Sequence, residues 1–554
     1  MSTEIRMLLA IVLSFLIFFL YQVVFVKKVP VPEKEPSGKE EVVEKEAPPE
    51  AEYVTVLGEE PPIEEPKIPV DAGPGRTITV STPLYAAELA EQGGAFKTFK
   101  LKNYKESVAD DSPMKGLINL PRGDTELTPV VAFSGKGVEG LGHAVFRASS
   151  DAHVMEVNEA KKDLSFTWTS PNGVTVVKTY SFSPDTYEMG LEVKVRNLAP
   201  KPVGDNLTLS LRNVRDDTGS RYAFSGPAAL INGELEEIAA KKIAKNGSYT
   251  GRIAWVATED QYFMSAIVPE KAEEANLKLT LAAKDVLKTT YVDPSGPVAT
   301  KTERTYKYTL YFGPRSLTAL SHAGSDLRRI VDFGFFDMIA KPLLHAMNFT
   351  YRYVPNYGIA IILITFIVKL LFWPLSNKSY KSMSQMKRLQ PKMQEIRTKY
   401  KNDKKMMNQE LMNLYKVYKV NPLGGCLPMV LQIPVFFAFY KMLYQAIELR
   451  HAPFFLWMND LAAPDRLFSF SFKVPMMTPP YGIPVLTLIM GASMFLQQKM
   501  TPPPGDPTHA KMMMFMPIFF TFIFINFPSG LVLYWLVNNV LSMTQQYYIA
   551  KKMA

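Results

Sequence analysis

A single lysine, Lys369, interrupts an otherwise uncharged apolar run from Gly358 to Pro374. At about 1.5 Å of rise per residue, a helix of this length crosses most of a hydrocarbon layer roughly 30 Å thick. The amino group has two interpretations. Its four-carbon stem lets the charge snorkel to the nearby helix end, or the ammonium faces a polar cavity as a fixed cation. A fixed cation would attract carboxylates without making or breaking covalent bonds.

The sequence offers little for metal, disulfide or nucleotide chemistry. Cys426 is the only cysteine, which excludes an internal disulfide and a cysteine-based zinc site, and the six histidines are scattered without an H-E-x-x-H motif. A phosphate-binding loop requires a glycine directly before its lysine, but Thr300 stands before Lys301. We expect no cofactor and no metal. No acidic residue lies within the apolar runs, which disfavours proton- or sodium-coupled transporters.

A strongly basic segment follows the apolar run. Residues Ser376–Lys419 contain twelve Lys/Arg and three Asp/Glu, so the segment carries +9, the net charge of the whole chain. A short basic loop beside a membrane span marks the cytoplasmic side. Met386, Met393 and Met407 recur at helical spacing with leucines, which predicts a helical hairpin whose methionines either form its core or bind varied apolar segments. Its charge suits ribosomal RNA, anionic lipid heads or plain hydration, and we expect no specific DNA.

Further apolar runs predict a polytopic α-helical membrane protein with six spans. Residues 1–28 contain the charge-free run Met7–Val26, which is long enough for an uncleaved transmembrane anchor. Residues 351–554 form a predicted five-helix core that includes the hairpin 376–419. Counting spans from the basic segment places both termini in the cytoplasm. The other predicted core spans are Pro422–Ile447, Tyr481–Gln497, Met512–Phe527 and Gly530–Tyr547.

Three segments separate the anchor from the core. Residues 29–76 hold ten Pro and thirteen Asp/Glu against five Lys/Arg, a composition typical of a solvated, disordered linker. Residues 77–325 alternate apolar and polar side chains, as in Leu191–Arg196, and so predict a large all-β domain. Residues 326–350 space apolar and charged side chains by three to four, which predicts either an amphipathic helix in the membrane interface or a core helix of the β domain.

Four ordered motifs connect these elements to a known family. They are Thr365–Lys369, Leu389–Lys392, Asn421–Cys426 followed by Pro428, Gln432 and Pro434, and Phe527–Tyr534. Together they closely resemble the YidC family of membrane protein insertases, and the resemblance covers nearly the whole chain. It implies that the β domain is a periplasmic super-sandwich similar to sugar-binding mutarotases. Such a domain either serves as a scaffold or holds a sugar or peptide in a groove.

The resemblance also implies a substrate groove. Lys369 stands where the family has its groove cation, a position at which arginine is common, so this chain keeps the charge and loses the planar fork. Trp535 stands where tyrosine is frequent. Ordinary helix packing is the alternative for Ile433 and Phe436, and hairpin packing is the alternative to substrate capture for Met386, Met393 and Met407. The implied groove positions are Lys369, Thr365, Gln432, Ile433, Phe436, Tyr534 and Trp535.

These expectations define an insertase that integrates and helps fold transmembrane segments in the bacterial inner membrane. It would use a hydrophilic groove open to the cytoplasm, alone or with the Sec translocon, and it would not be an enzyme. The implied partners are nascent membrane proteins, the ribosome or signal-recognition receptor, and membrane lipids. The alternatives are a small-solute channel or transporter with a periplasmic binding domain, and an anchored sugar-active enzyme. Transporters usually contain internal sequence repeats, and this sequence shows none, which disfavours the transporter.

Overall fold

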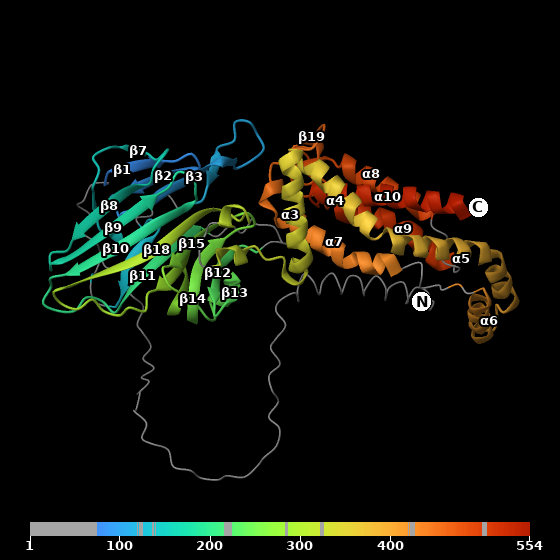
Figure 1. Ribbon diagram of the computed structural model, residues 1–554, viewed down its shortest axis with the longest axis horizontal. Helices are drawn as coiled ribbons and strands as arrows, with labels where there is room; N and C mark the ends of the chain where they lie inside the picture. The colour runs from blue at the N-terminus through green and yellow to red at the C-terminus, as the bar shows by residue number, and fades with distance from the viewer. Residues whose placement is uncertain are drawn as a thin grey trace, which may run out of the picture. The chain divides into compact units, whose positions relative to one another are not determined.

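The computed structural model describes residues 75–118, 120, 126–135, 138, 140–214, 224–282, 286–321, 326–418, 420, 427–500 and 507–553. The predicted anchor 1–28, nearly all of the predicted linker 29–76 and the Asn421–Cys426 motif lie outside these residues. Strands occupy the first part of the described chain and helices the second, as the colour sequence in Figure 1 shows.

The first part is an all-β domain of two main sheets, which confirms the predicted fold class for this region. One sheet has thirteen strands in the order β5-β11-β17-β16-β14-β15-β18-β10-β9-β8-β6, with β12 and β13 branching from β14. The other has five strands in the order β4-β3-β2-β1-β7. All pairs between these strands are antiparallel except β1 with β7. The strands are β1 (Thr77–Ser81), β2 (Tyr85–Ala90), β3 (Ala95–Lys105), β4 (Met114–Gly116), β5 (Val130–Ser134), β6 (Arg147–Ala148), β7 (Val154–Glu156), β8 (Lys162–Thr169), β9 (Val174–Phe182), β10 (Glu188–Asn197), β11 (Asn206–Val214), β12 (Gly226–Ile231), β13 (Glu234–Glu237), β14 (Ser248–Glu259), β15 (Phe263–Pro269), β16 (Glu273–Ala282), β17 (Val286–Val292) and β18 (Thr302–Pro314).

Aromatic side chains join the two sheets. Phe96 of β3 contacts Tyr180 of β9 and Phe312 of β18, with ring centroids 5.3 and 5.6 Å apart in edge-to-face geometry. The predicted alternation is present in β10, where Leu191 is buried and pairs with Tyr180 on one side and Tyr308 on the other. Burial of one strand face against the facing sheet therefore gives this domain its period of two.

A lysine lies fully inside this core. Lys178 on β9 donates to the carbonyl oxygen of Gly93 over 2.6 Å, and its amino group lies 4.7 Å from the centroid of the Phe146 ring. Burial lowers the pKa of Lys178 to about 7, because the core disfavours its charged form.

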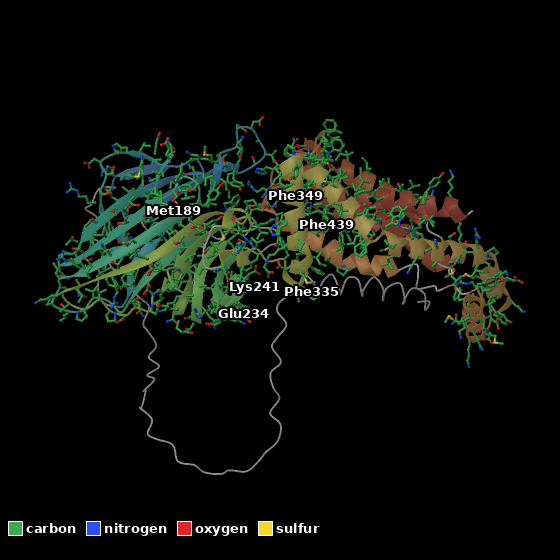
Figure 2. All side chains as sticks on the ribbon, in the orientation of Figure 1. Met189, Glu234, Lys241, Phe335, Phe349 and Phe439 are labelled. Carbon is green, nitrogen blue, oxygen red and sulfur yellow. The ribbon has the colours of Figure 1, made fainter. Side chains whose placement is uncertain are left out.

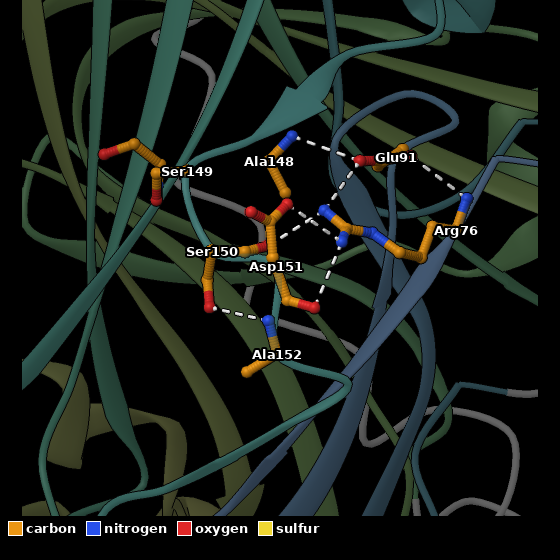
Figure 3. Close-up of polar contacts among 8 residues, drawn as sticks. Arg76, Glu91, Ala148, Ser149, Ser150, Asp151 and Ala152 are labelled. Atoms are coloured by element: carbon orange, nitrogen blue, oxygen red, sulfur yellow. Dashed lines mark hydrogen bonds and ion pairs between the residues drawn. The ribbon is translucent and has the colours of Figure 1, made fainter.

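Polar contacts fix the beginning of the described chain to the β domain (Figure 3). Arg76 donates to the Ser150 carbonyl oxygen over 2.8 Å and forms an ion pair with Glu91 at 3.3 Å. Glu91 also accepts from the backbone N–H of Ala148. These bonds join the start of β1 to the end of β2 and the loop after β6.

The second part is helical and centres on α10, which packs against α4, α5, α7 and α8. A small hairpin of β19 (Leu467–Phe470) and β20 (Tyr481–Ile483) lies between α7 and α8, so the predicted span beginning at Tyr481 starts instead as a strand. The helices are α3 (Asp337–Tyr353), α4 (Tyr357–Leu371), α5 (Trp373–Lys399), α6 (Lys404–Val417), α7 (Leu427–Gln445), α8 (Val485–Met500), α9 (Pro507–Phe524) and α10 (Ser529–Met553); the short α2 (Ala240–Ile243) belongs to the β domain.

The predicted helix from Asp326 to Thr350 begins later than expected. Two short 3₁₀ turns, Leu327–Ile330 and Gly334–Phe336, precede α3. Gly334 has a φ of 65°, which a right-handed helix does not allow, and its N–H donates to Asp332. α3 packs against α4 and α7. Phe335 and Phe349, labelled in Figure 2, are 91% and 60% exposed.

The first predicted core span forms α4, and one residue separates it from α5, the first helix of the hairpin. α4 ends at Leu371, and α5 begins at Trp373 with a bend of 66°. Pro374 lies in the first turn of α5, where its missing N–H and fixed φ are tolerated. In the described part of the chain, no single helix has the length and hydropathy to cross a membrane alone, whereas α4 and α5 meet that requirement as a bent pair.

Candidate functional site

Lys369 lies near the end of α4 with its side chain turned into the helical part of the molecule. Asn356 caps the start of this helix by accepting from the N–H of Ile359 over 3.1 Å. Lys369 is 7% exposed, and its ammonium donates to Ser542 over 2.6 Å and to Asn538 over 3.4 Å. The charge therefore points to α10, a geometry that favours an internal cation over a snorkelling one.

Ser542 is oriented to accept from this ammonium. Its hydroxyl donates its only proton to the backbone carbonyl of Asn538, 2.6 Å away, so its lone pairs face Lys369. Gln545, one turn further along α10, donates to Asn377 over 2.9 Å and to the carbonyl of Trp373 over 3.3 Å. Asn538, Ser542 and Gln545 follow the spacing of a single helix face, so α10 presents a polar stripe to α4 and α5.

Gln432 extends this network to α7. Its amide donates to the Asn538 side-chain oxygen over 2.9 Å, and the Tyr534 hydroxyl is hydrogen-bonded to Gln432. Asn538 and Gln432 are partly exposed, while Ser542 and Lys369 are buried. Polar groups thus continue from the surface of the helical part to the buried ammonium.

The remaining predicted groove residues are apolar or locally bonded. Thr365 is on the same face of α4 as Lys369, but its hydroxyl donates to the Ile361 carbonyl of its own helix over 2.6 Å. Ile433 is 43% exposed next to Gln432, so its side chain is not core packing.

An aromatic cluster lies one turn before the polar stripe. Phe436 contacts Trp535 edge to face at 4.8 Å, and Phe439 stacks on Tyr534 at 4.5 Å between ring centroids. Trp535 also contacts Phe524 of α9 at 5.3 Å, which makes it a packing residue between helices. Phe436 is partly buried and forms the boundary between this cluster and exposed Ile433.

The ammonium of Lys369 has only neutral oxygen partners in the described residues. None of the ion pairs described there includes Lys369. A buried cation without a carboxylate is electrostatically uncompensated, and a carboxylate brought beside it would gain more than it would in water. Within the same residues, no group of three or more His, Cys, Asp or Glu is placed to hold a metal ion.

The hairpin of α5 and α6 has a core of its own. Met393 is 3% exposed and packs with Leu389, Leu411 and Val420, while Met386 and Met407 cover this core. The structure thus places Met393 within this core and Met386 and Met407 against it with part of their surface exposed. Met406 and Met412 on α6 are exposed, at 42% and 54%. Lys392 donates to the Tyr418 hydroxyl and holds the two helices together.

Comparison with known proteins places these features in a family. A family model described as 60Kd inner membrane protein matches residues 349–554, and one described as YidC periplasmic domain matches residues 77–346. The membrane protein insertase YidC of Syntrophus aciditrophicus is 40% identical, with 99% of each chain covered. The chain belongs to the YidC family of membrane protein insertases. The YidC of Geobacter metallireducens is 41% identical over 100% of this chain and 99% of its own.

Membership of the YidC family establishes the general function. The chain is a membrane protein insertase and not an enzyme, and the transporter alternative is not favoured. YidC proteins are inner-membrane proteins with a periplasmic domain, and the periplasmic-domain model matches residues 77–346, which contain the β domain, so the β domain is periplasmic.

Two solved structures are more distant. A YidC insertase crystal structure has 18% identity and a TM-score of 0.36, covering 86% of this chain and 95% of its own. A galactose mutarotase-like protein from Lactobacillus casei has 11% identity and a TM-score of 0.30, covering 43% of this chain and 99% of its own.

Sequence reasoning missed the polar stripe of α10, of which Asn538 and Ser542 bind Lys369. Asn538, Ser542 and Gln545 were recoverable in principle, because polar residues at positions i, i+4 and i+7 interrupt the run Gly530–Tyr547. The apolar character of the run as a whole hides this narrow polar stripe.

Proposed function

We propose that this insertase accepts the polar tail of a nascent transmembrane segment in a groove beside Lys369 that opens to the cytoplasm. The supporting observation is the buried ammonium of Lys369, bound by Ser542 and Asn538 and reached through partly exposed Asn538 and Gln432. A carboxylate in the tail would replace these neutral oxygens as the partner of the ammonium.

The proposed topology has six spans. They are the anchor within residues 1–28 and helices α4, α7, α8, α9 and α10, with both termini in the cytoplasm. The charge of +9 on Ser376–Lys419 supports the cytoplasmic location of the hairpin, since Lys/Arg bias in short loops sets orientation. The exposed rings of Phe335 and Phe349 support an interfacial position for α3 and the turn before it.

The physical role of the groove is to shorten the apolar path. A charged residue at the centre of a bilayer costs about 2.5–3.5 kcal/mol on translocon-based scales, and a polar site part-way across reduces that barrier. Lys369 lies two residues from the end of α4 that leads into the hairpin, so the polar stripe serves the cytoplasmic half of the membrane. Exposed Ile433 and partly buried Phe436 would contact the apolar part of the substrate beside it.

A lysine at position 369 attracts a carboxylate by its charge and does not impose a fixed hydrogen-bond geometry on it. An ammonium attracts a carboxylate as a point charge, whereas a guanidinium would bind it with two parallel hydrogen bonds. We therefore propose that Lys369→Arg retains insertion and that Thr365, Tyr534 and Trp535 shape the groove wall without bonding to the substrate charge.

The hairpin is proposed to meet partners before the groove does. Its basic surface suits the ribosome, the signal-recognition receptor and anionic lipids, and exposed Met412 suits apolar nascent helices. Cooperation with the Sec translocon belongs to the same proposal and rests on the family alone.

Reconstitution tests the proposed function directly. The purified full-length protein, placed in liposomes without nucleotide, should insert a single-span substrate whose translocated tail carries two carboxylates. Lys369→Ala should slow this insertion and leave a substrate with a neutral tail unchanged, while Lys369→Arg restores the rate. Equal rates for both tails in Lys369→Ala would remove the cation from the mechanism.

A further inference from the structure

The loop between α7 and α8 is bonded to the turn between α9 and α10. The Ser529 N–H donates to the Ala463 carbonyl over 2.8 Å, and the Gly530 N–H donates to the Leu461 carbonyl over 2.9 Å. Pro464 and Pro528 form an antiparallel bridge in the same place. We call the contacts of residues 460–466 with residues 525–530 the outer latch.

Arg466 holds the other side of the latch. Its guanidinium donates to the carbonyls of Ile525 over 2.8 Å and Pro480 over 2.9 Å, and it reaches the Asn526 side-chain oxygen at 3.3 Å. Asn526 in turn accepts from the N–H of Thr478 and donates to the carbonyl of Met476. The planar guanidinium of Arg466 thereby joins its own loop to Pro480 and to residues 525–526.

Asp465 connects the latch to α8. Its carboxylate is almost fully buried, accepts from the Trp457 indole N–H over 2.6 Å, and accepts from the N–H of Leu486 over 2.5 Å. The bond to Leu486 satisfies a free N–H in the first turn of α8. The beginnings of α8 and α10 and the end of α9 are thus all bonded to a single loop.

The latch is separated from the polar stripe. Asn538, the nearest residue of the stripe, follows Ser529 by nine residues, which corresponds to about 14 Å along α10. The intervening residues Leu531, Val532 and Leu533 are buried and aliphatic. The polar groups around Lys369 therefore end at an apolar layer, and beyond that layer lies the latch.

Close packing supports a closed end here. A Cβ added at Gly530 would lie 3.1 Å from the Leu461 carbonyl oxygen and 3.3 Å from the Ile361 side chain. The backbone N–H groups of Ser529 and Gly530, which a helix start normally offers to water, are bonded to the loop. Because the backbone N–H groups at the start of α10 already have hydrogen-bond partners and are closely packed, this end of the helix does not need water to satisfy them.

We propose that the outer latch is the permeability barrier of this insertase, and that Arg466 is the residue that positions it. This inference rests on the proposed groove, because the latch has a barrier to provide only if the cytoplasmic half of the core admits water. The latch would let the groove be hydrated from one side while ions are retained on the other. It would remain closed while a substrate enters.

Ion leakage from liposomes tests the proposal. The full-length protein and its Arg466→Ala variant would be reconstituted, and the decay of a preset potassium gradient measured together with insertion of a single-span substrate. Arg466→Ala removes several charge-assisted contacts, and the loss of even one changes an open–closed equilibrium roughly tenfold, so this variant should leak at least about ten times faster than the unmodified protein. Lys473→Ala, an exposed cation in the same loop, is the matched control and should not leak.

Insertion in the same vesicles separates this inference from the proposed function. Failure of the unmodified protein to insert substrate would contradict the groove, whereas normal insertion with no leak in Arg466→Ala would overturn the latch. Asn526→Ala supplies a second variant if Arg466→Ala does not fold. Vesicles with Asn526→Ala that retain the potassium gradient as well as the unmodified protein does would equally overturn the proposal.

A crosslink tests whether the latch stays closed. Ala463→Cys and Ser529→Cys, combined with Cys426→Ser, place two thiols on bonded neighbours of the bridge. Oxidation should leave both the ion barrier and the insertion rate unchanged. Insertion that stops on oxidation and returns on reduction would overturn the proposal, because it would show that the latch must open.

Discussion

The ammonium of Lys369 and the hydroxyl of Ser542 are hydrogen-bonded over 2.6 Å, although they are 173 positions apart in the chain. The bond joins α4 to α10 and holds a charge in the interior without an acidic partner in the described residues. A neutral acceptor fixes the position of the ammonium and leaves its charge uncompensated. This arrangement suits a site whose anionic partner arrives from outside and departs again.

Removing the hydroxyl should weaken the groove selectively. Ser542→Ala deletes an acceptor for a charged donor, a bond of about 1.5–3 kcal/mol, and should slow insertion of acidic tails at least about tenfold. Ser542→Thr keeps the acceptor and should keep the rate. Insertion kinetics with acidic and neutral tails provide the measurement. In a Lys369→Ala background, Ser542→Ala should have no further effect, and additive losses would contradict a shared role.

Most of the β domain should be dispensable for insertion. Deleting Thr77–Gly313 removes β1 to β18 almost entirely, whereas the groove residues lie on α4, α7 and α10. The shortened protein should insert substrates within about threefold of the full-length rate, since it loses no side chain of the polar stripe. A control deletion that extends through α3 should fail, because α3 packs against α4 and α7. Complete loss of insertion by a folded, membrane-embedded Thr77–Gly313 deletion would place essential chemistry in the β domain.

Lys178 should make the stability of the β domain rise with pH. The pKa of Lys178 is about 7 in the folded domain and 10.5 in the reference state, so between these values the unfolded chain binds more protons. The free energy of unfolding should therefore increase by up to about 1.4 kcal/mol per pH unit in this window, and the gain is lost as pH falls through 7.

The measurement is thermal unfolding of the detergent-solubilised protein, followed by the circular dichroism of its strands between pH 8 and 9. The upper limit is set because burial raises the pKa of tyrosines such as Tyr180 and Tyr308, which lowers the stability as pH approaches 10. This range avoids Glu259, whose burial raises its pKa to about 8 and gives the opposite slope at lower pH. Lys178→Met should reduce the increase in the free energy of unfolding with pH. Lys194→Met, a half-exposed lysine on the neighbouring strand β10, should preserve it. An unchanged slope in Lys178→Met would mean that another group titrates.

Methionines inside and outside the hairpin should behave differently. Met393→Ala removes a buried side chain and should destabilise the hairpin by about 2–5 kcal/mol, detectable as faster proteolysis between α5 and α6. Met412→Ser should leave proteolysis unchanged. If the hairpin captures substrates, a photocrosslinker at Met412 should trap an arrested nascent chain before one at Phe436 does. Earlier labelling at Phe436 would assign first contact to the groove.

The alternation of side chains was enough to predict the β domain, because strands between two packed sheets repeat one burial pattern, as β10 does around Leu191. Apolar runs likewise located the core helices. The start of α3 was predicted wrongly, since periodicity continues through Gly334 while the backbone turns there with φ at 65°. A sequence pattern indicates which face of a helix is apolar, but it does not indicate where a turn interrupts the helix.

The candidate site was predictable only in part. The charge of Lys369 stands out in an apolar run, and the family resemblance supplied its groove neighbours. Its bonds to Ser542 and Asn538 depend on how α4 packs against α10, which no local pattern specifies. The methionine stripe of the hairpin had the correct helical period, but the same period describes a core and a binding face.

The single residue between α4 and α5 gives the hairpin a mechanical connection to the groove. Phe372 separates two helices bent by 66°, and α5 with its 27 residues is about 40 Å long. A lateral pull of about 10 Å at the far end of such a rod would rotate it by roughly 14° about Phe372. Lys369 is three residues from that pivot, and Gln545 bonds the base of the rod to α10. A sideways force applied to the far end of the hairpin by a bound nascent chain would therefore act on the position of the Lys369 ammonium.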